Sequence, residues 1–552
     1  MKKIYYILFL LILPLVGCSD FLEQDNKSNV PRDQFYGTAT GYNSLMNTVY
    51  SSLRAIYGIE PWIFCAGTDL YASGRNKVPD GLGTYKGLLD SDPDVKKFYT
   101  NCYAGIQLAN TAIYYADHTE STDLLGQYKA EARFIRAYYY YLLIQNFGGV
   151  ALVKDMIDSP VVSFERKSAT DTYAFIISEM EDLKSSLPAK TPVFGRVDQR
   201  TVNHFLAKTY LCRGYETFGT AADFTKAAEY ADAAINNQTL STSFNNLFWP
   251  DQKNEQDEEV IWSVQYDESS IATPTSGNMQ QAFFGTYLGG VEDGNKYTTS
   301  TLTPTIRLHQ LFSKGDTRYE GTFMVQFYTH YYDFYTKSKQ LDTEKVLYYY
   351  PPAWQVADTA AWRAANPATR SKTVIIPMQE NTLAVSGKPT TYIAAMSGDV
   401  YGVAVVRKFD DPTSVFSTTG STRDVILARV GESYLVAAEA YYKAGNSAKA
   451  AERINVVRKR AAAAGYDMSI KASDVSIDFI LDERARELAG EYHRWMDLKR
   501  TGKLIEYAVK YNPNIIGADY FKGVDGQNKI LRPIPLDAIN LNQAKVEQNP
   551  GY

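Results

Sequence analysis

Three glutamates at four-residue spacing form a prominent group of ionisable residues in this chain. Glu483, Glu487 and Glu491 lie in the stretch ILDERARELAGEYHRWMDLKR, residues 480–500. On a helix, this spacing predicts that the three carboxylates share one face. Two such carboxylates could act as general acid and general base on a glycoside if they faced a sugar across several ångströms.

Basic residues around these glutamates favour a structural role instead. The same stretch contains four arginines, Arg484, Arg486, Arg494 and Arg500. A neighbouring cation keeps a carboxylate ionised, whereas a general acid has to hold its proton near neutral pH. We therefore expect an ion-pair network that holds helices together, and no enzymatic activity. A surface glycoside hydrolase that uses Glu483 or Glu487 is the less favoured alternative.

Other catalytic and metal-binding patterns do not occur in the sequence. The five histidines lack metal-ligand spacing such as HExxH, and no P-loop is found. GLGTYKG at 81–87 does not fit a dinucleotide fingerprint, and GESYL at 431–435 lacks the last glycine of a nucleophile elbow. We expect neither a cofactor nor a metal. Cys65, Cys102 and Cys212 match no redox motif, which indicates buried thiols with room for one disulfide.

Aromatic residues offer a binding chemistry in place of catalysis. The chain holds 43 tyrosines and 6 tryptophans, so many rings are expected outside an ordinary core, where they are typical of a binding surface. Sugars stack their C–H faces on such rings and donate hydroxyls to polar neighbours. Trp249, Trp262 and Trp495 lie in regular runs and are expected in the core. The candidate ligand-binding residues lie in loop-like segments, and they are Arg75, Tyr85, Tyr287, Tyr297, Trp354 and Trp362.

The N-terminal residues predict the location of the protein. Lys2 and Lys3 precede an apolar run, residues 4–16, that is too short to span a bilayer. The run ends in LVGC, which resembles the lipobox of bacterial lipoproteins. We expect residues 1–17 to be a signal peptide, Cys18 to be the lipidation site and residues 18–38 to be a flexible tether. An ordinary secretory signal is the alternative.

The charge distribution excludes one class of partner. The formal net charge of the 552-residue chain is −5, and acidic and basic residues are interspersed. No basic block occurs, so no nucleic-acid partner is expected.

The elements that position these residues are predicted to be helical hairpins. In residues 425–463, apolar residues recur at three- and four-residue steps from Ile426 to Tyr441, Gly445 interrupts the pattern, and Ser447 is the expected N-cap of a second helix. Residues 200–237 repeat this order, with Ala207 in the place of Ala438. Such hairpins are of the tetratricopeptide kind and bury their faces by stacking. Two unrelated amphipathic hairpins are the alternative.

Helical regularity largely disappears between residues 238 and 423. This part contains short strand-like runs and the densest aromatic segments, FYTHYYDFY and VLYYYPPAWQ. Long irregular segments usually carry function. We therefore expect a mostly α fold, a single domain over 39–552. Its superhelical scaffold of tetratricopeptide-like hairpins spans 39–237 and 424–552, and an irregular loop and short-strand excursion over 238–423 carries the ligand face.

Several segments resemble one known family. They are GCSDFLE, EARFIRAYYYYLLIQNFGGVAL, RVDQRTVNHFLAKTYLCRG, LARVGESYLVAAEAYYKAG, ERARELAGEYHRWMDLKRTGKL and LRPIPLDAINLNQ…QNPGY. In order and spacing they resemble the SusD/RagB family of outer-membrane nutrient-binding lipoproteins from Bacteroidetes. The resemblance covers essentially the whole chain.

This resemblance implies a fold, a partner and a function. It implies four tetratricopeptide-like helix pairs and an irregular ligand-binding face, with Cys18 as the lipidation site. It further implies that the protein sits on a SusC-like TonB-dependent transporter at the cell surface. There it would bind an oligosaccharide or polysaccharide without catalysis and deliver it for import. A peptide ligand, as in some family members, is the alternative, and a tetratricopeptide scaffold for protein tails is disfavoured by the signal peptide.

Overall fold

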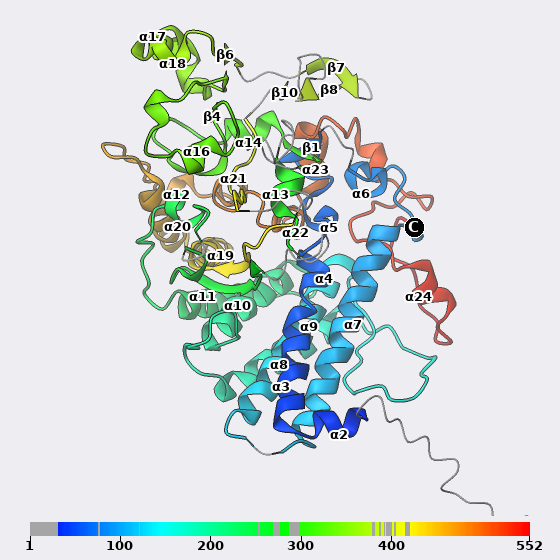
Figure 1. Ribbon diagram of the computed structural model, residues 1–552. Helices are drawn as coiled ribbons and strands as arrows, with labels where there is room; N and C mark the ends of the chain where they lie inside the picture. Colours follow the sequence, from blue (N-terminus) through cyan, green and yellow to red (C-terminus); the bar gives the residue numbers. More distant parts are fainter. Residues whose placement is uncertain are drawn as a thin grey trace, which may run out of the picture.

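The fold was analysed in a computed structural model, which describes residues 31–74, 78–120, 122–251, 254–268, 277–285, 298–299, 301–377, 381–385, 388–390, 392–393, 400–401, 404–413 and 420–552. Between 381 and 401 it describes the backbone alone. The chain is mostly helical, as the sequence predicts, with short strands between the helices (Figure 1).

The regular elements described in the first part of the chain are helices, apart from one short strand. Its elements are α2 (Arg32–Tyr36), α3 (Ala39–Ser51), α4 (Arg54–Tyr57), α5 (Trp62–Cys65), β1 (Tyr71–Ser73), α6 (Asp80–Thr84), α7 (Pro93–Ala116), α8 (Leu125–Phe147), α9 (Ala169–Leu183), η3 (Lys184–Ser186), α10 (Gln199–Tyr215) and α11 (Ala221–Ile235). α2 lies at the end of the stretch expected to be a tether, and its Tyr36 ring packs edge-on against Tyr115 at 5.2 Å between centroids.

In the middle of the chain, the elements that the structure describes are all short, as expected for an irregular excursion. They are α12 (Phe244–Leu247), η4 (Asn254–Gln256), β2 (Val260–Val264), α13 (Gln280–Phe284), β3 (Leu302–Pro304), α14 (Ile306–Gln310), α15 (Arg318–Thr322), β4 (Gln326–Phe327), α16 (Asp333–Thr336), η7 (Leu341–Thr343), β5 (Tyr348–Tyr349), η8 (Ala353–Asp358), α17 (Thr359–Ala365), α18 (Pro367–Arg370), β6 (Val374–Ile375), β7 (Asn381–Val385), β8 (Lys388–Thr390), β9 (Tyr392–Ile393) and β10 (Val400–Tyr401).

The last part returns to longer helices. It comprises β11 (Val425–Arg429), α19 (Val430–Lys443), α20 (Ser447–Ala461), η9 (Ala472–Asp474), α21 (Ile477–Glu487), α22 (Arg494–Arg500), α23 (Leu504–Tyr511), η10 (Ala518–Phe521) and α24 (Leu536–Asn540). The expectation that the helical spacing begins at Ile426 was wrong, because α19 begins at Val430. Ile426 belongs to β11, which pairs antiparallel with β2. The N-cap of α20 is Asn446, whose side chain accepts the backbone N–H of Lys449, and not Ser447.

The two predicted hairpins exist and pack against each other. α10 and α11 form one hairpin, α19 and α20 form the other, and α11 lies against α19. Asp232 of α11 accepts hydrogen bonds from Tyr441 of α19 at 2.6 Å and from Arg453 of α20 at 2.9 and 3.0 Å. This stacking buries the seam of small residues, including Ala207 and Ala438, as tetratricopeptide-like repeats require.

α8 lies at the centre of the helical part and is covered on all sides. All of its residues from Ala130 to Phe147 except Arg133 are buried. It ends at Gly148, whose φ of +72° is a conformation that favours glycine. The four consecutive tyrosines 138–141 are therefore core residues. Three of their phenols form hydrogen bonds inside the protein: Tyr138 bonds Tyr57, Tyr139 bonds Ser52 at 2.7 Å, and Tyr140 bonds the Val153 carbonyl at 3.0 Å. The tyrosine excess thus belongs in good part to the core.

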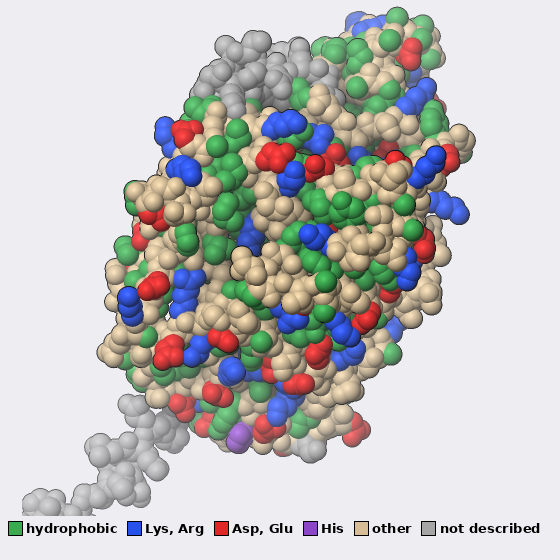
Figure 2. Space-filling model, turned by 180° about the vertical axis from the view of Figure 1, so that it is seen from behind, with side chains coloured by type: hydrophobic (Ala, Val, Ile, Leu, Met, Phe, Trp, Pro, Cys, Tyr) green, Lys and Arg blue, Asp and Glu red, His purple; other side chains and the backbone are tan. Residues whose placement is uncertain are grey.

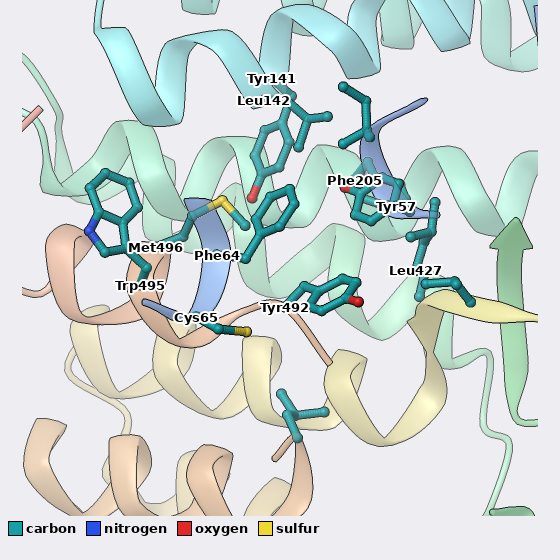
Figure 3. Close-up of a cluster of buried hydrophobic side chains, with 14 of the residues drawn as sticks. Tyr57, Phe64, Cys65, Tyr141, Leu142, Phe205, Leu427, Tyr492, Trp495 and Met496 are labelled. Carbon is teal, nitrogen blue, oxygen red and sulfur yellow. The ribbon is translucent and has the colours of Figure 1, made fainter. Parts of the chain in front are cut away.

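The core continues from α8 into the last part of the chain (Figure 3). Phe64 of α5 stacks on Tyr492 at 5.4 Å, and Phe205 of α10 lies within 5.7 Å of Trp262 in β2. Trp262 and Trp495 are fully buried, which confirms their expected core position, while Trp249 is half-buried against Phe334 and Tyr335. The three cysteines, Cys65, Cys102 and Cys212, are buried free thiols, so none of them forms the disulfide that the sequence allowed.

Positively and negatively charged side chains are mixed on the surface. Figure 2 shows Lys and Arg side chains interspersed with Asp and Glu over the face that it displays. In the part of the chain that the structure describes, no helix combines the length and the apolar character needed to cross a membrane.

Candidate functional site

Two segments expected to carry ligand residues start from one small sheet. β1 pairs antiparallel with β3, with Ser73 opposite Leu302, and the backbone N–H of Gly74 donates to the Thr301 carbonyl at 3.0 Å. Arg75 follows Gly74 in the chain, and Tyr287 and Tyr297 precede Thr301. Arg75, Tyr287 and Tyr297 lie outside the described residues, as does Cys18.

The C-terminal part of the chain holds this sheet in place. Asn512 donates to the carbonyls of Thr68 and Tyr71, at 2.6 and 3.0 Å, and Asn514 accepts the backbone N–H of Ser73 at 2.7 Å. These asparagines are positioning residues that sequence reasoning missed. No local pattern marks them, because their partners lie more than 400 residues earlier in the chain.

Tyr85 does not face a ligand, and its expected role was wrong. Its side chain is fully buried, and its ring stacks on Phe521 at 4.0 Å. Its hydroxyl accepts the indole N–H of Trp495 at 3.0 Å and donates to the Gly67 carbonyl at 3.1 Å. Both hydrogen-bonding roles of the phenol are filled inside the protein, so Tyr85 anchors the loop after α6 to the core.

Trp362 lies on the outer helix α17 and is partly buried. Its indole stacks on the buried Tyr349 ring at 4.1 Å and an interplanar angle of 13°. The Arg370 guanidinium lies 4.6 Å from the indole centroid, and it also donates to the Trp362 carbonyl at 2.8 Å. Tyr349 and Arg370 were not identified from the sequence, although the run VLYYYPPAWQ was. Together these two side chains hold the indole in one orientation.

Trp354, in η8, belongs to the same lobe and is also partly buried. Its ring meets the buried Tyr319 of α15 edge-on at 5.1 Å. The lobe is built on the three-stranded sheet β4–β5–β6, in which β5 pairs antiparallel with β4 and parallel with β6. In Figure 1, α17, α18 and β6 lie at the upper left, at the opposite end of the molecule from α2. The structure thus brings Trp354 and Trp362 into one lobe, which we call the aromatic lobe.

The three glutamates form the predicted ion-pair network, with one difference in geometry. α21 ends at Glu487, so Glu491 lies beyond the helix in a turn where Gly490 has a φ of +77°. Arg429 nevertheless binds both: its Nη1 donates to Glu487 at 2.6 Å, and its Nε donates to Glu491 at 2.7 Å. Arg318 bridges Glu483 at 2.8 Å and Glu487 at 3.0 Å. All of these side chains are buried.

This network holds three regions of the chain together. Arg318 and Lys408 come from the middle excursion, Arg429 and Arg460 come from β11 and the α19–α20 hairpin, and the glutamates come from α21 and the turn after it. Although burial opposes ionisation, Arg460, Arg429 and Arg318 lower the pKa of Glu487 to about 2. Arg486, Arg318 and Arg458 likewise hold the pKa of Glu483 below its usual value. Carboxylates in this state cannot act as general acids near neutral pH.

A second buried cluster contains a serine, a histidine and a carboxylate, the residue types of the catalytic triad in serine hydrolases. Ser433 Oγ lies 2.8 Å from His204 Nδ1, and His204 Nε2 lies 3.0 Å from the Glu432 carboxylate. Lys208 also bonds Glu432 at 2.7 Å. Ser433, His204 and Glu432 are at most 1% exposed, so no substrate reaches the serine in this structure. Burial lowers the pKa of His204, which favours the neutral imidazole. The cluster joins α10 to α19.

These features define a helical-repeat scaffold with an inserted aromatic lobe. A comparison with models of protein families shows to which family this scaffold belongs. The model described as SusD family matches residues 258–552, and the model described as starch-binding associating with outer membrane matches residues 20–211. Since the first match covers more than half of the chain, the protein belongs to the SusD family, which confirms the resemblance seen in the sequence.

Individual relatives match the chain over most of its length. SusD-like protein P2 of Formosa agariphila is 24% identical over 583 residues, which cover 100% of both chains. Starch-binding protein SusD of Bacteroides thetaiotaomicron is 26% identical over 461 residues, 80% of this chain and 76% of that protein. The solved structure of a laminarin binding SusD-like protein superposes with a TM-score of 0.66 at 21% identity, covering 94% of this chain and 100% of the other. The last match supports the fold.

Proposed function

We propose that this protein is a non-catalytic, cell-surface glycan-binding lipoprotein that delivers its ligand to a SusC-like TonB-dependent transporter. The observation that carries the proposal is membership in the SusD family along the chain, with relatives named for binding starch and laminarin. The buried state of Glu483, Glu487 and Ser433 supports a binding role over hydrolysis.

Binding would rest on aromatic stacking with polar groups beside the rings. Trp362 offers an indole held rigid by Tyr349 and Arg370, so little conformational entropy is lost when a sugar stacks on it. Trp354 supplies a second ring in the same lobe. Arg75, Tyr287 and Tyr297 remain candidates on the segments that adjoin β1 and β3.

Attachment to the outer membrane would come from acyl chains on Cys18. The LVGC sequence fits the lipobox, and acyl chains on its cysteine would supply membrane affinity. A family model described as associating with the outer membrane matches from residue 20 onward. The transporter is the expected partner at that surface.

The test is affinity electrophoresis of the soluble chain that starts at Ser19. Native gels that contain starch, laminarin or other plant, fungal and host polysaccharides are compared with a gel without polysaccharide. We expect one polysaccharide class to retard migration. If none does, and a peptide panel gives saturable binding by calorimetry, the ligand is a peptide and the glycan proposal is wrong.

A further inference from the structure

An apolar groove lies on the side of the molecule formed by α7, the segment 150–166 and the C-terminal part around α24. In Figure 1 these elements lie side by side at the right. The groove has a volume of about 920 Å³, which is within the range of small-molecule sites. A second hollow of about 300 Å³ lies within the segment 152–164 and shares residues with the groove, including Val161 and Phe164.

The walls of the groove are mainly aliphatic. They include Ile106, Val150, Val153, Ile157, Val161, Val162, Ile534, Pro535, Ala538, Leu541 and Val546. Several of these side chains are open to solvent: Val161 is 46% exposed, Val162 is 49% exposed and Leu541 is 78% exposed. Exposed apolar side chains gathered around one hollow are typical of a binding site. The aliphatic character distinguishes this groove from the aromatic lobe and does not suit a sugar.

Hydrogen bonds give the groove a fixed shape. Asn542, after α24, accepts the backbone N–H of Phe164 at 2.9 Å and donates to its carbonyl at 2.7 Å. The backbone N–H of Gln543 donates to the Val162 carbonyl at 2.8 Å. The segment and the C-terminal part are thus joined along one edge, and the hollow between them is a preformed feature of the fold.

One charged side chain in the wall lacks a counter-ion. The Arg166 guanidinium makes four hydrogen bonds, all to uncharged oxygens: the carbonyls of Phe147, Gly149 and Glu547, and Oδ1 of Asn549. Among the described residues, no carboxylate lies within 4 Å of it, whereas Lys96 and Asp537, also in the lining, pair with each other. The Glu547 carboxylate acts on Arg166 from a greater distance and pairs with Lys545 at 3.2 Å. A guanidinium has five N–H donors, so one donor of Arg166, and a charge without a direct ion pair, remain for a ligand.

The other polar groups of the lining are largely engaged within the protein. Tyr103 donates to the Ala151 carbonyl at 2.9 Å. Gln107 donates to the Ile157 carbonyl at 3.3 Å, while its Oε1 is buried without a partner among the described residues and needs a water molecule or a ligand hydroxyl. The groove therefore presents an apolar wall, one available cation and one acceptor.

We propose that this groove binds a fatty-acid-like anionic amphiphile, with its carboxylate on Arg166 and its aliphatic chain along the Ile106, Val153 and Ile157 wall. The carboxylate supplies the charge that Arg166 lacks, and the chain covers the exposed valines and Leu541. This site is separate from the aromatic lobe, and its test uses no glycan, so either proposal can fail without the other.

The experiment is displacement of a fluorescent fatty acid, 11-(dansylamino)undecanoate, from the soluble chain starting at Ser19, after its cooperative melting has shown that it is folded. Octanoate, decanoate, dodecanoate and dodecanol serve as competitors below their micelle concentrations. We expect affinity to rise by up to about 4-fold for each methylene added. Dodecanoate is expected to bind about 10-fold more tightly than dodecanol, because only the carboxylate pairs with Arg166.

Substitutions in the wall of the groove test whether dodecanoate binds there. Val162→Asp and Leu541→Asp place a carboxylate on the exposed wall, where folding tolerates it, and each is expected to weaken dodecanoate binding by at least about 10-fold. Val193→Asp is the matched control, since Val193 is 55% exposed and lies outside the groove. The proposal is overturned if no chain displaces the probe saturably, if dodecanol binds as well as dodecanoate, or if both groove variants bind as the control does.

Discussion

The guanidinium of Arg494 donates two hydrogen bonds to the carboxylate of Asp69, at 2.7 and 2.6 Å, although the two residues lie 425 positions apart in the sequence. Both side chains are buried. Asp69 immediately precedes Leu70, whose carbonyl accepts the backbone N–H of Thr305, so the pair fixes the start of the β1–β3 ladder. The arginine-rich segment at 480–500 thus reaches the part of the protein from which the candidate ligand segments start.

Replacing one partner of this ion pair is expected to lower the stability of the protein more than replacing both partners. Asp69→Asn or Arg494→Gln leaves one buried charge unpaired and should lower the free energy of unfolding by about 3–5 kcal/mol. The double variant Asp69→Leu/Arg494→Met removes both charges and should lose less than the sum of the single variants. Urea unfolding followed by circular dichroism measures these values. Additive losses in the double variant would mean that the two residues act independently.

The elements found from the sequence are those whose signals are local. The hairpins α10–α11 and α19–α20 repeat apolar residues at helical spacing within about 40 residues, and breaks at Gly219 and Gly445 separate their helices. The same periodicity gave a wrong prediction at Ile426, which it assigned to a helix. This residue continues the spacing of α19 but pairs in β11 with Ser263 of β2, more than 160 residues earlier. A strand partner at that distance leaves no trace in a local pattern.

The candidate site was only partly accessible to sequence reasoning for the same physical reason. Loop-like neighbours suggested that Tyr85 and Trp362 were both exposed. Tyr85 is buried because Phe521 and Trp495, more than 400 residues later, cover its ring and bind its hydroxyl. Trp362 keeps an exposed part because its partners, Tyr349 and Arg370, come from the same lobe. Polarity and turn residues alone do not distinguish these two environments.

The buried carboxylates predict how stability depends on pH. Nearby cations depress the pKa of Glu483, Glu487 and Glu491 in the folded protein, to about 2 for Glu487. In the unfolded chain these groups titrate near pH 4.3, so the unfolded state binds more protons as pH falls. Their stabilisation is complete above about pH 5 and is lost as pH falls through 4 towards 2, at up to about 4 kcal/mol per pH unit.

Other buried groups determine how the stability of the fold depends on pH above pH 4. Burial lowers the pKa of His493 and of His309 to about 3 and also lowers that of His204, so these three residues begin to destabilise the fold as pH falls below about 6.5. Burial raises the pKa of Asp424 to about 7, which has the opposite effect, since stability from its protonated form is lost as pH rises from 4 to 7. The three histidines outweigh Asp424, so urea midpoints at pH 7, 5, 4 and 3 should fall moderately from pH 7 to 5 and more steeply below pH 4, where the three glutamates add to the loss. A midpoint that stays constant from pH 7 to 3 would contradict this account.

Substitution of Glu487 separates a structural role from a catalytic one. Glu487→Gln removes the charge that faces Arg318, Arg429 and Arg460, and it should lower the free energy of unfolding by about 3–5 kcal/mol. Neither the native chain nor the variant should release reducing sugar from the polysaccharide that it binds. Glu258→Gln is the control, because Glu258 is exposed. Release by the native chain that disappears in a folded Glu487→Gln variant would establish hydrolysis.

The aromatic lobe predicts which substitutions weaken glycan binding. Trp362→Ala removes a rigid, partly buried indole, and Trp354→Ala removes the second ring. Each should weaken binding to the polysaccharide that retards the protein by about 1–3 kcal/mol if it is an anchor. Calorimetry against an oligosaccharide of that class gives the values, and thermal melting shows whether the packing of Trp354 on Tyr319 matters for folding.

Tyr114→Ala provides the matched control for these two variants. The Tyr114 ring is 40% exposed and stacks on His118 at the end of α7, near α2 and away from the aromatic lobe. Its loss should leave glycan affinity unchanged, because exposure alone does not make a ring a ligand platform. If Trp354→Ala and Trp362→Ala also bind as the native chain does, the lobe is not the glycan site. The ligand contacts would then have to be sought on the segments that adjoin β1 and β3, where Arg75, Tyr287 and Tyr297 are the residues to replace next.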